Sequence, residues 1–308
     1  MKHIAFCVSV GACVLLAGPA LAQQPAGQPP APNFDAVQIK ATDLGGRTWM
    51  LEGQGGNMTV IAGDDAVILV DTEFAPLHSK IAMAVGQLSD KPIRYVVNTH
   101  LHGDHTGGNS AFWLGGATIV AHQNLRRSLA EGTTNALTGN KTPPAPRSAL
   151  PTRTYAGASM TLPLKGRRVT LLHLPNAHTQ GDTAVWIPDA NVLATGDIVS
   201  WGNRYPNIDV GDKGDIDGII RAVDGFIARS NDRTKIVPGH GALMTKKDLV
   251  AYRQLLADAR EAVAKAKASG MTEDQVVAAK PLAAVQTRAG ANDQASVNFV
   301  RLIYRSVG

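Results

Sequence analysis

Short apolar runs alternate with turn-forming residues over residues 48–199. Each run is brief and rich in Val, Ile, Leu or Ala, which is typical of buried β-strands. The predicted strands are 58–62, 67–70, 93–97, 118–120, 169–174, 184–187 and 192–194. Between them, residues 76–88 and 122–131 have helical character. Because strands and helices are mixed along the chain, the sequence predicts an α/β or α+β fold.

Two further helices are predicted near the C-terminus. Thr245 has Asp248 three residues after it, which indicates a capped helix start. Apolar residues then recur at spacings of three and four until Gly270, where we expect this helix to end. These residues are Leu249, Tyr252, Leu256, Ala259 and Val263. The last helix is predicted over 293–304 and closes the domain, with its inward face formed by Val297, Val300 and Tyr304.

Two segments have no regular pattern. Residues 139–152 contain four prolines, and residues 200–214 are interrupted by Gly and Pro and carry Trp201 and Tyr205. Long irregular segments inside a compact domain are often functional, although a plain surface excursion is an equal alternative for 139–152. Trp201 and Tyr205 therefore have two interpretations, as residues lining a pocket or as aromatic packing under a loop.

The first 22 residues have the pattern of an export signal. Lys2 and His3 precede an apolar run, and Ala20-Leu21-Ala22 forms a small-residue cleavage ending. The run is too short to cross a bilayer, so no stable membrane insertion is expected after cleavage. We expect an exported protein, periplasmic or secreted; a retained N-terminal anchor is the alternative. Residues 23–40 are predicted to be a Pro- and Gln-rich linker.

Composition narrows the chemistry. Both cysteines, Cys7 and Cys13, lie in the predicted signal, so the mature chain has no thiolate ligand and no disulfide. Acylation at Cys13 is disfavoured by the residues around it. The formal net charge of +5 is mild and its Lys and Arg residues are scattered, so nucleic acid is not an expected partner. The expected partner is a small-molecule substrate, and the oligomeric state stays open.

A dense group of metal-ligand side chains follows the strand predicted at 93–97. Its sequence is Asn-Thr-His-Leu-His-Gly-Asp-His, at residues 98–105. Residues two apart in an extended chain point the same way, so His100 and His102 can face one ion together. Gly103 lets the chain turn, and Asp104 and His105 can then reach a second ion. Imidazole and carboxylate without thiolate suit zinc first, with iron, manganese or cobalt as alternatives.

Three more polar residues follow predicted strands beside a turn-forming residue. They are His178 in Pro-Asn-Ala-His-Thr-Gln-Gly-Asp, Asp197 in Thr-Gly-Asp and His240 in Pro-Gly-His-Gly. Taken singly, each is more often a capping or surface residue. Together with the 98–105 motif, they complete a set of seven: His100, His102, Asp104, His105, His178, Asp197 and His240.

The residues and their order resemble the metallo-β-lactamase superfamily of metal-dependent hydrolases, over 47–242. That resemblance implies a four-layer αββα sandwich with two divalent ions at one edge. It implies that His100, His102 and His178 bind the first ion, that Asp104, His105 and His240 bind the second, and that Asp197 bridges both. Asp71 matches a family aspartate that braces the first motif by hydrogen bonding. We therefore expect a metallo-β-lactamase-like catalytic domain at 41–245, followed by a helical extension packed on it at 246–308.

The resemblance implies a hydrolase. Two ions sharing a water lower its pKa toward neutrality, so a hydroxide is available to attack the carbonyl of an ester, thioester, lactone or amide-like substrate. Asp104 is the expected catalytic residue, which orients this hydroxide and passes on a proton. The remaining mature-chain histidines, His78, His122 and His173, are not expected to be ligands because the family set is full.

Two alternatives stay open at this stage. A β-lactamase is consistent with export, but lactamase branches of the family usually have Cys or Ser where this chain has Asp197. A non-catalytic exported metal-binding protein belongs to another class, and the complete ligand set argues against it. No glutathione-binding pattern is clear in the C-terminal helices, which weakens a thioesterase.

Overall fold

The computed structural model describes residues 32–307. The predicted export signal at 1–22 and most of the predicted linker at 23–40 lie outside the described residues. Within residues 32–307, no helix is both long and apolar enough to cross a membrane. Residues Phe34–Gly308 make one compact unit by their contacts. Its division into a catalytic domain and a helical extension stays a prediction.

Seven strands form the first sheet, in the order β1-β2-β3-β4-β5-β6-β9. They are β1 Lys40–Gly45, β2 Thr48–Glu52, β3 Met58–Ala62, β4 Val67–Val70, β5 Ile93–Val97, β6 Thr118–His122 and β9 Arg153–Tyr155. The strands from β4 to β9 in this order pair in parallel. Val70 pairs with Val97, so the segments that leave β4 and β5 emerge side by side at one edge.

Five strands form the second sheet, in the order β10-β11-β12-β13-β14. They are β10 Ser159–Leu164, β11 Arg167–His173, β12 Thr183–Ile187, β13 Val192–Ala194 and β14 Lys235–Val237. Only β13 and β14 pair in parallel among these five, with Ala194 opposite Val237. The segments that leave these two strands therefore also emerge together. A separate pair, β7 Thr133–Thr134 and β8 Lys141–Thr142, lies in the segment before β9.

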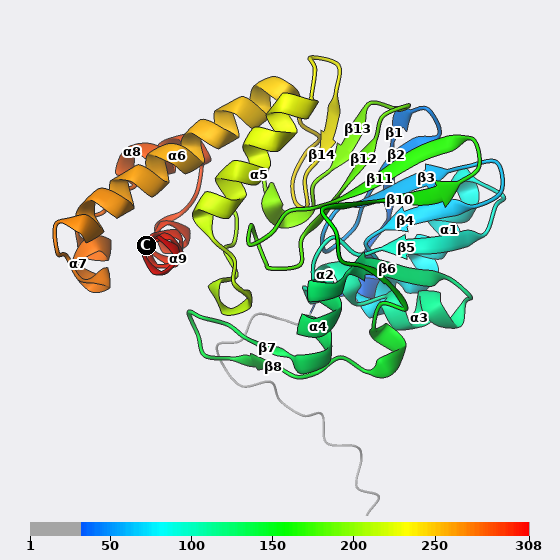
Figure 1. The fold of residues 1–308 in the computed structure, drawn as a ribbon, viewed down its shortest axis with the longest axis horizontal. Coiled ribbons are helices and arrows are strands. Elements are labelled where there is room, and N and C mark those ends of the chain that lie inside the picture. The colour runs from blue at the N-terminus through cyan, green and yellow to red at the C-terminus, as the bar shows by residue number, and fades with distance from the viewer. Residues whose placement is uncertain (1–31, 308) are drawn as a thin grey trace, which may run out of the picture. The chain divides into compact units, whose positions relative to one another are not determined.

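The two sheets face each other, and helices cover their outer faces (Figure 1). Apolar side chains of both sheets, such as Ile68, Val97, Leu171 and Val185, form one buried cluster between them. The outer face of the first sheet packs against α1 His78–Leu88 and α3 Asn109–Leu114. Because both faces are covered, β3 and β4 are buried at every residue, which explains their continuous apolar runs. The fold is the αββα sandwich that the resemblance implied.

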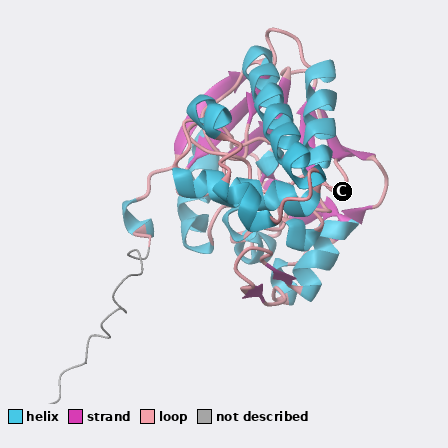
Figure 2. Cartoon of the chain, turned by 90° about the vertical axis from the view of Figure 1, so that its left-hand side faces the viewer, coloured by secondary structure: helices cyan, strands magenta, loops and turns pink. Residues whose placement is uncertain are grey.

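The outer face of the second sheet is covered by the C-terminal half of the chain. Ala184, Leu193 and Ile236 on this face pack in one cluster with residues of α5, α6, α8 and α9. From this side the helices lie in front of the strands (Figure 2). The helices here are α5 Ile216–Arg229, α6 Lys246–Ala268, α7 Glu273–Ala278, α8 Ala283–Ala289 and α9 Asp293–Ser306. Thr245 and Asp248 form the predicted capping box of α6.

The strands predicted from apolar runs are all present, and so are the predicted helices. The inward face of α9 was predicted in part: Val300 is buried and Tyr304 packs, partly buried, against the core cluster, whereas Val297 does not belong to that cluster. Phe299, Leu302 and Ile303, which were not predicted, complete this face. The β1–β2 hairpin and α5 were not predicted; α5 is a capped amphipathic helix whose signal was overlooked.

A matched pair of substitutions tests the inter-sheet cluster. Leu171→Ala removes a side chain that is fully buried between the sheets, and we expect the free energy of unfolding to fall by about 2–5 kcal/mol. Leu114→Ala makes the same change at a side chain that is 75% exposed, and its effect should stay within about 0.5 kcal/mol. Urea denaturation of both variants measures the difference, and equal effects would contradict this assignment of the core.

Candidate metal centre

The seven predicted ligand residues meet at the edge where the parallel strands end. His100 and His102 follow β5, and His102 directly precedes the short helix α2 Gly103–Thr106, which carries Asp104 and His105. Asp197 lies three residues after Ala194, and His240 three residues after Val237, so the β13–β14 register brings them level. His178 comes from the segment that joins β11 to β12. Both sheets therefore contribute to one site.

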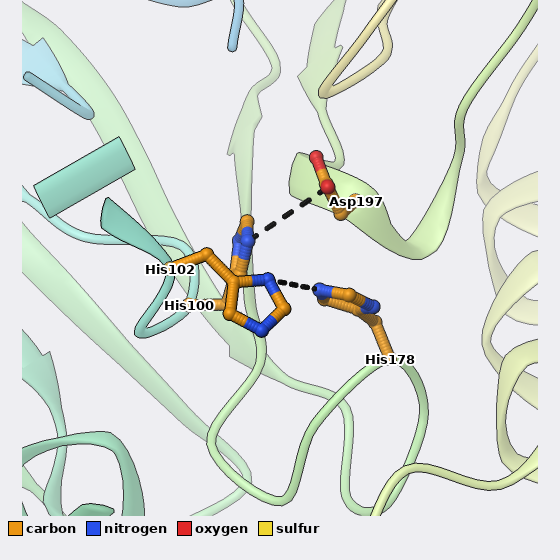
Figure 3. A group of neighbouring side chains, drawn as sticks. All are labelled: His100, His102, His178 and Asp197. Atoms are coloured by element: carbon orange, nitrogen blue, oxygen red, sulfur yellow. Dashed lines mark hydrogen bonds and ion pairs between the residues drawn. The ribbon is translucent and has the colours of Figure 1, made fainter. Parts of the chain in front are cut away.

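Their potential ligand atoms form two compact groups. His100, His102, His178 and Asp197 place one ligand atom each within 4.8 Å of one another. Figure 3 shows these four side chains converging from separate segments of the chain. Asp104, His105 and His240 form the second group under the same distance limit. In the second group, His240 Nε2 lies 3.2 Å from Asp104 Oδ2.

Asp197 lies between the two groups. Its Oδ1 is 3.2 Å from His105 Nε2, and its Oδ2 is 3.4 Å from His240 Nε2. The same Oδ2 is 3.9 Å from His100 Nε2 in the first group. One carboxylate therefore faces imidazoles of both groups, which is the arrangement that a bridging carboxylate requires.

Hydrogen bonds behind the imidazoles leave one nitrogen of each free to face the centre. Asp71 Oδ2 accepts from His105 Nδ1 at 2.8 Å and from Thr99 Oγ1 at 2.7 Å. Since the Thr99 hydroxyl proton is used there, its oxygen accepts from His100 Nδ1 at 3.0 Å. His178 Nδ1 donates to the Asn207 carbonyl at 2.8 Å. Each bond leaves Nε2 as the atom available to a metal. The bracing contacts expected of Asp71 are confirmed.

Asp209 has a role that the sequence analysis missed. Its Oδ2 accepts from His102 Nε2 at 2.9 Å, so His102 turns Nδ1 toward the centre, 3.1 Å from His178 Nε2. Asp209 belongs to the irregular 200–214 segment, which was singled out for its lack of pattern. That segment is therefore part of the site. In the sequence, the one signal for a role of Asp209 was its position in a long irregular loop.

A glycine-rich turn at 53–57 also escaped the sequence analysis. A Cβ on Gly56 would lie 2.0 Å from His105 Cε1, so only glycine allows the turn to approach this ring. Gly56 N donates to the Asp104 carbonyl, and Asn57 N donates to the Gly239 carbonyl. Glu73, fully buried, accepts from the Gly55 amide at 2.6 Å. The turn thus covers the second group and ties its two sides together.

The electrostatics suit divalent cations. Burial lowers the pKa of His178 to about 4, so this imidazole is neutral, the form that binds metal. Burial opposes ionisation of Asp197, but His105 and His100 outweigh it and hold its pKa well below the usual value. Burial likewise opposes protonation of His240, yet Asp104 and Asp197 raise its pKa to about 9. The carboxylates therefore favour a positive charge at the position of His240, which a proton or a metal ion can supply.

Two buried atoms at the centre provide a further test of fit. Among residues 32–307, His100 Nε2 and Asp197 Oδ1 are buried and make no hydrogen bond, although His105 Nε2 lies 3.2 Å from that oxygen. An unpaired buried polar atom costs free energy unless another group satisfies it. Both atoms face the interior of the ligand groups, where an ion would satisfy them. The residues therefore fit a metal centre built from imidazole and carboxylate.

The other predicted residues lie elsewhere. His78 packs against Phe112 on α3, and His122 stacks on His173 with ring centroids 3.5 Å apart. Within the described residues, none of these three histidines belongs to either ligand group. Tyr205 stacks on Phe299 of α9, which supports the packing interpretation. Trp201 lies beside the site, and its amide donates to the His240 carbonyl at 2.9 Å.

Known proteins share both the sequence pattern and the fold. Over 180 residues the chain is 27% identical to the 2,4-dinitroanisole O-demethylase subunit alpha of Nocardioides sp. (strain JS1661), covering 57% of this chain and 51% of that protein. The chain thus spans about half the length of this curated relative.

Solved structures support the fold alone at the identities involved. A metallo-beta-lactamase from Pontibacter korlensis superposes with a TM-score of 0.59 at 19% identity, covering 72% of this chain and all (100%) of that one. The stereoselective inverting sec-alkylsulfatase Pisa1 from Pseudomonas sp. superposes with a TM-score of 0.64 at 17% identity, covering 86% of this chain and 50% of that one.

The sequence pattern decides the family. Residues 51–240 match the metallo-beta-lactamase superfamily, and this range contains all seven predicted ligand residues. The match extends over more than half of the chain and agrees with the αββα architecture and with the geometry of the ligand groups. The chain belongs to the metallo-beta-lactamase superfamily.

Proposed function

We propose that this protein is a hydrolase that works with two divalent metal ions, zinc in the first instance. The observation that carries the proposal is the Asp197 carboxylate, which faces imidazoles of both ligand groups at 3.2 to 3.9 Å. His100, His102 and His178 would hold one ion and Asp104, His105 and His240 the other. Iron or manganese would fit the same donors.

Divalent ions at this centre would supply a water of lowered pKa as the nucleophile and would polarise the bond under attack. The chain's own residues set the conditions for that chemistry. Asp71, Asn207 and Asp209 fix the orientations of the imidazoles, and burial of His100, His105 and His178 keeps bulk water from their rings. Preorganised ligands need no rearrangement when the reaction occurs.

Asp104 is the residue we propose for proton transfer. Its side chain is 26% exposed, whereas the His105 side chain beside it is fully buried. One carboxylate oxygen is 3.2 Å from His240 Nε2 and 3.7 Å from His105 Nε2. A carboxylate in this position can orient a water and pass its proton to solvent.

The proposed reaction is hydrolysis of an ester, thioester, lactone or amide-like bond in a small molecule, carried out after export by the 1–22 signal. The names of two similar proteins add further candidate substrates. The O-demethylase subunit suggests an aryl methyl ether, and the sec-alkylsulfatase suggests a secondary alkyl sulfate. A β-lactamase is the second candidate, because the Pontibacter korlensis enzyme shares the fold. The aspartate at position 197 argues against a β-lactamase, because lactamase branches of the family usually have Cys or Ser at this position.

A substrate panel tests this proposal. Purified protein with its metal content measured is assayed with an aryl ester, a lactone, S-lactoylglutathione, nitrocefin, a phosphodiester, an alkyl sulfate and an activated aryl methyl ether. We expect turnover of an ester-type substrate that a chelator abolishes. Turnover of nitrocefin above the others would favour the β-lactamase. Two bound metals with no turnover of any substrate would favour a non-catalytic metal-binding protein.

Removing one ligand should separate the two ion sites. We expect His102→Ala to reduce the metal content from about two ions per chain toward one and to lower kcat/KM by at least about 100-fold. Elemental analysis and steady-state kinetics measure both effects. His78→Ala is the matched control, because His78 lies against Phe112 outside the ligand groups. Retention of both metals and full hydrolysis in His102→Ala would refute the assignment.

Asp209 should control metal affinity without being a ligand. Asp209→Ala removes the acceptor of His102 Nε2, so the ring loses its fixed orientation. We expect metal affinity to fall by about 10- to 100-fold. Competition with a chromogenic chelator measures the change. Asp232→Ala, in the exposed turn before β14, is the control and should leave affinity unchanged; equal affinities in the two variants would disprove the role.

A further inference from the structure

A cavity of about 300 Å³ lies between the 200–214 segment and the helices α6 and α8, and none of the seven predicted ligand residues lines it. Its lining includes Trp201, Asn203, Arg204, Tyr252, Leu255 and Arg288. This volume is at the lower end of the range of about 300–1,000 Å³ for small-molecule sites. A ligand of one aromatic ring with short substituents matches that size.

The floor of the cavity is in direct contact with two ligand-bearing turns. The Trp201 amide donates to the His240 carbonyl at 2.9 Å, and a Cβ on Gly241 would lie 2.0 Å from the Trp201 carbonyl. The Tyr252 hydroxyl donates at 3.0 Å to the carbonyl of Ile198, the residue next to Asp197. A molecule in the cavity is therefore positioned next to the turns that carry His240 and Asp197.

The cavity combines aromatic walls with positive charge. The Trp201 and Tyr252 rings are nearly perpendicular, with centroids 6.3 Å apart, and the Tyr252 ring is fully buried. Arg288 is paired with Asp258 at 2.6 Å. Arg204 is exposed, and within residues 32–307 its guanidinium has no hydrogen-bond or ion-pair partner. Asp258 balances the charge of Arg288, so the positive charge of Arg204 remains available to a ligand.

The shape of the cavity depends on a close approach of two turns. Gly290, after α8, has φ 64°, and a Cβ there would lie 2.4 Å from Asn203 Oδ1. The glycine therefore lets the 202–204 turn lie against the end of α8. This contact holds Arg204 at the rim, on the segment that also supplies Asp209 to His102.

We propose that this cavity binds an aromatic carboxylate, as the leaving-group side of an ester substrate, with Arg204 as the residue that selects its negative charge. The guanidinium fork matches a carboxylate in geometry and charge, and the half-buried Trp201 offers an aromatic surface for a flat ring. The proposal rests on the hydrolase function proposed above, and it adds the substrate class: small esters of hydroxyl-bearing aromatic acids.

The reaction with the simplest such substrate, 4-acetoxybenzoate, is balanced with water alone. The water oxygen forms a bond to the acetyl carbon, and the bond from that carbon to the phenolic oxygen breaks. The products are acetate and 4-hydroxybenzoate, with one proton released. Phenyl acetate undergoes the same cleavage without the carboxylate, so the pair isolates the contribution of the charge.

Binding provides the test that does not depend on turnover. Calorimetric titration of the metal-loaded protein with 4-hydroxybenzoate and with its neutral amide, 4-hydroxybenzamide, should show preference for the acid. We expect Arg204→Gln to raise the Kd of the acid about tenfold, and Arg204→Lys to keep most of the affinity. Thr287→Trp, at an exposed lining residue, should block both ligands by filling the cavity.

The control is Arg233→Gln, since Arg233 is exposed and precedes β14, at the opposite end of the strand from His240. It should leave the Kd unchanged. Unchanged affinity in both Arg204→Gln and Thr287→Trp would overturn the proposal, because the carboxylate would then be bound at the metal centre itself. Thermal melting of each variant verifies that it is folded.

Kinetics separate this proposal from the function on which it rests. The ratio of kcat/KM for 4-acetoxybenzoate to that for phenyl acetate should fall about tenfold in Arg204→Gln and stay constant in Arg233→Gln. Arg204-dependent binding with neither ester hydrolysed would support the cavity and refute the ester hydrolase. Hydrolysis of both esters with a ratio that Arg204→Gln leaves unchanged would refute the cavity and support the hydrolase.

Discussion

The buried carboxylate of Asp197, set among the imidazoles of His100, His105 and His240, is the interaction on which the site depends. Burying a charge is costly unless opposite charge or hydrogen bonds compensate it. Here the imidazoles hold the carboxylate ionised, and it in turn favours cations on both sides. Any change that separates the two sheet edges would expose or unpair this group, so the alignment of the sheets and the chemistry of the centre are linked.

The two sheets reach this alignment by the same device. In each, a pair of parallel strands ends level, so that β4 with β5 and β13 with β14 deliver their following residues to one edge. The apolar cluster between the sheets then fixes the two edges against each other. Asp71 and the glycine-rich 53–57 turn complete the connection, since they contact the His105 side of the centre, and Asn57 also contacts the Gly239 side.

The 200–214 segment connects the metal centre with the C-terminal helices. At one end Trp201 contacts the His240 turn, and at the other Asp209 orients His102. Between them Tyr205 stacks on Phe299, so packing of α9 holds the middle of the segment. An irregular loop is thereby kept in a defined conformation by groups that belong to the candidate metal centre and to the helices. The helices thus shape the surroundings of the site as well as covering the second sheet.

The sequence by itself predicted the buried strands β3 to β6 and β11 to β13, the helices α1, α4, α6 and α9, and the types of the candidate ligands, but not β1, β2, β9, β10 or α5. Apolar runs of strand length mark buried strands, and the spacing of His100, His102, Asp104 and His105 allows few uses other than metal binding. Sequence order could not decide how His178, Asp197 and His240 meet, because their approach depends on strand register and sheet packing. Asp209, Glu73 and the 53–57 turn were missed for the same reason. The partners that orient His102, His105 and His178 are selected by distance in space, which only the tertiary structure defines.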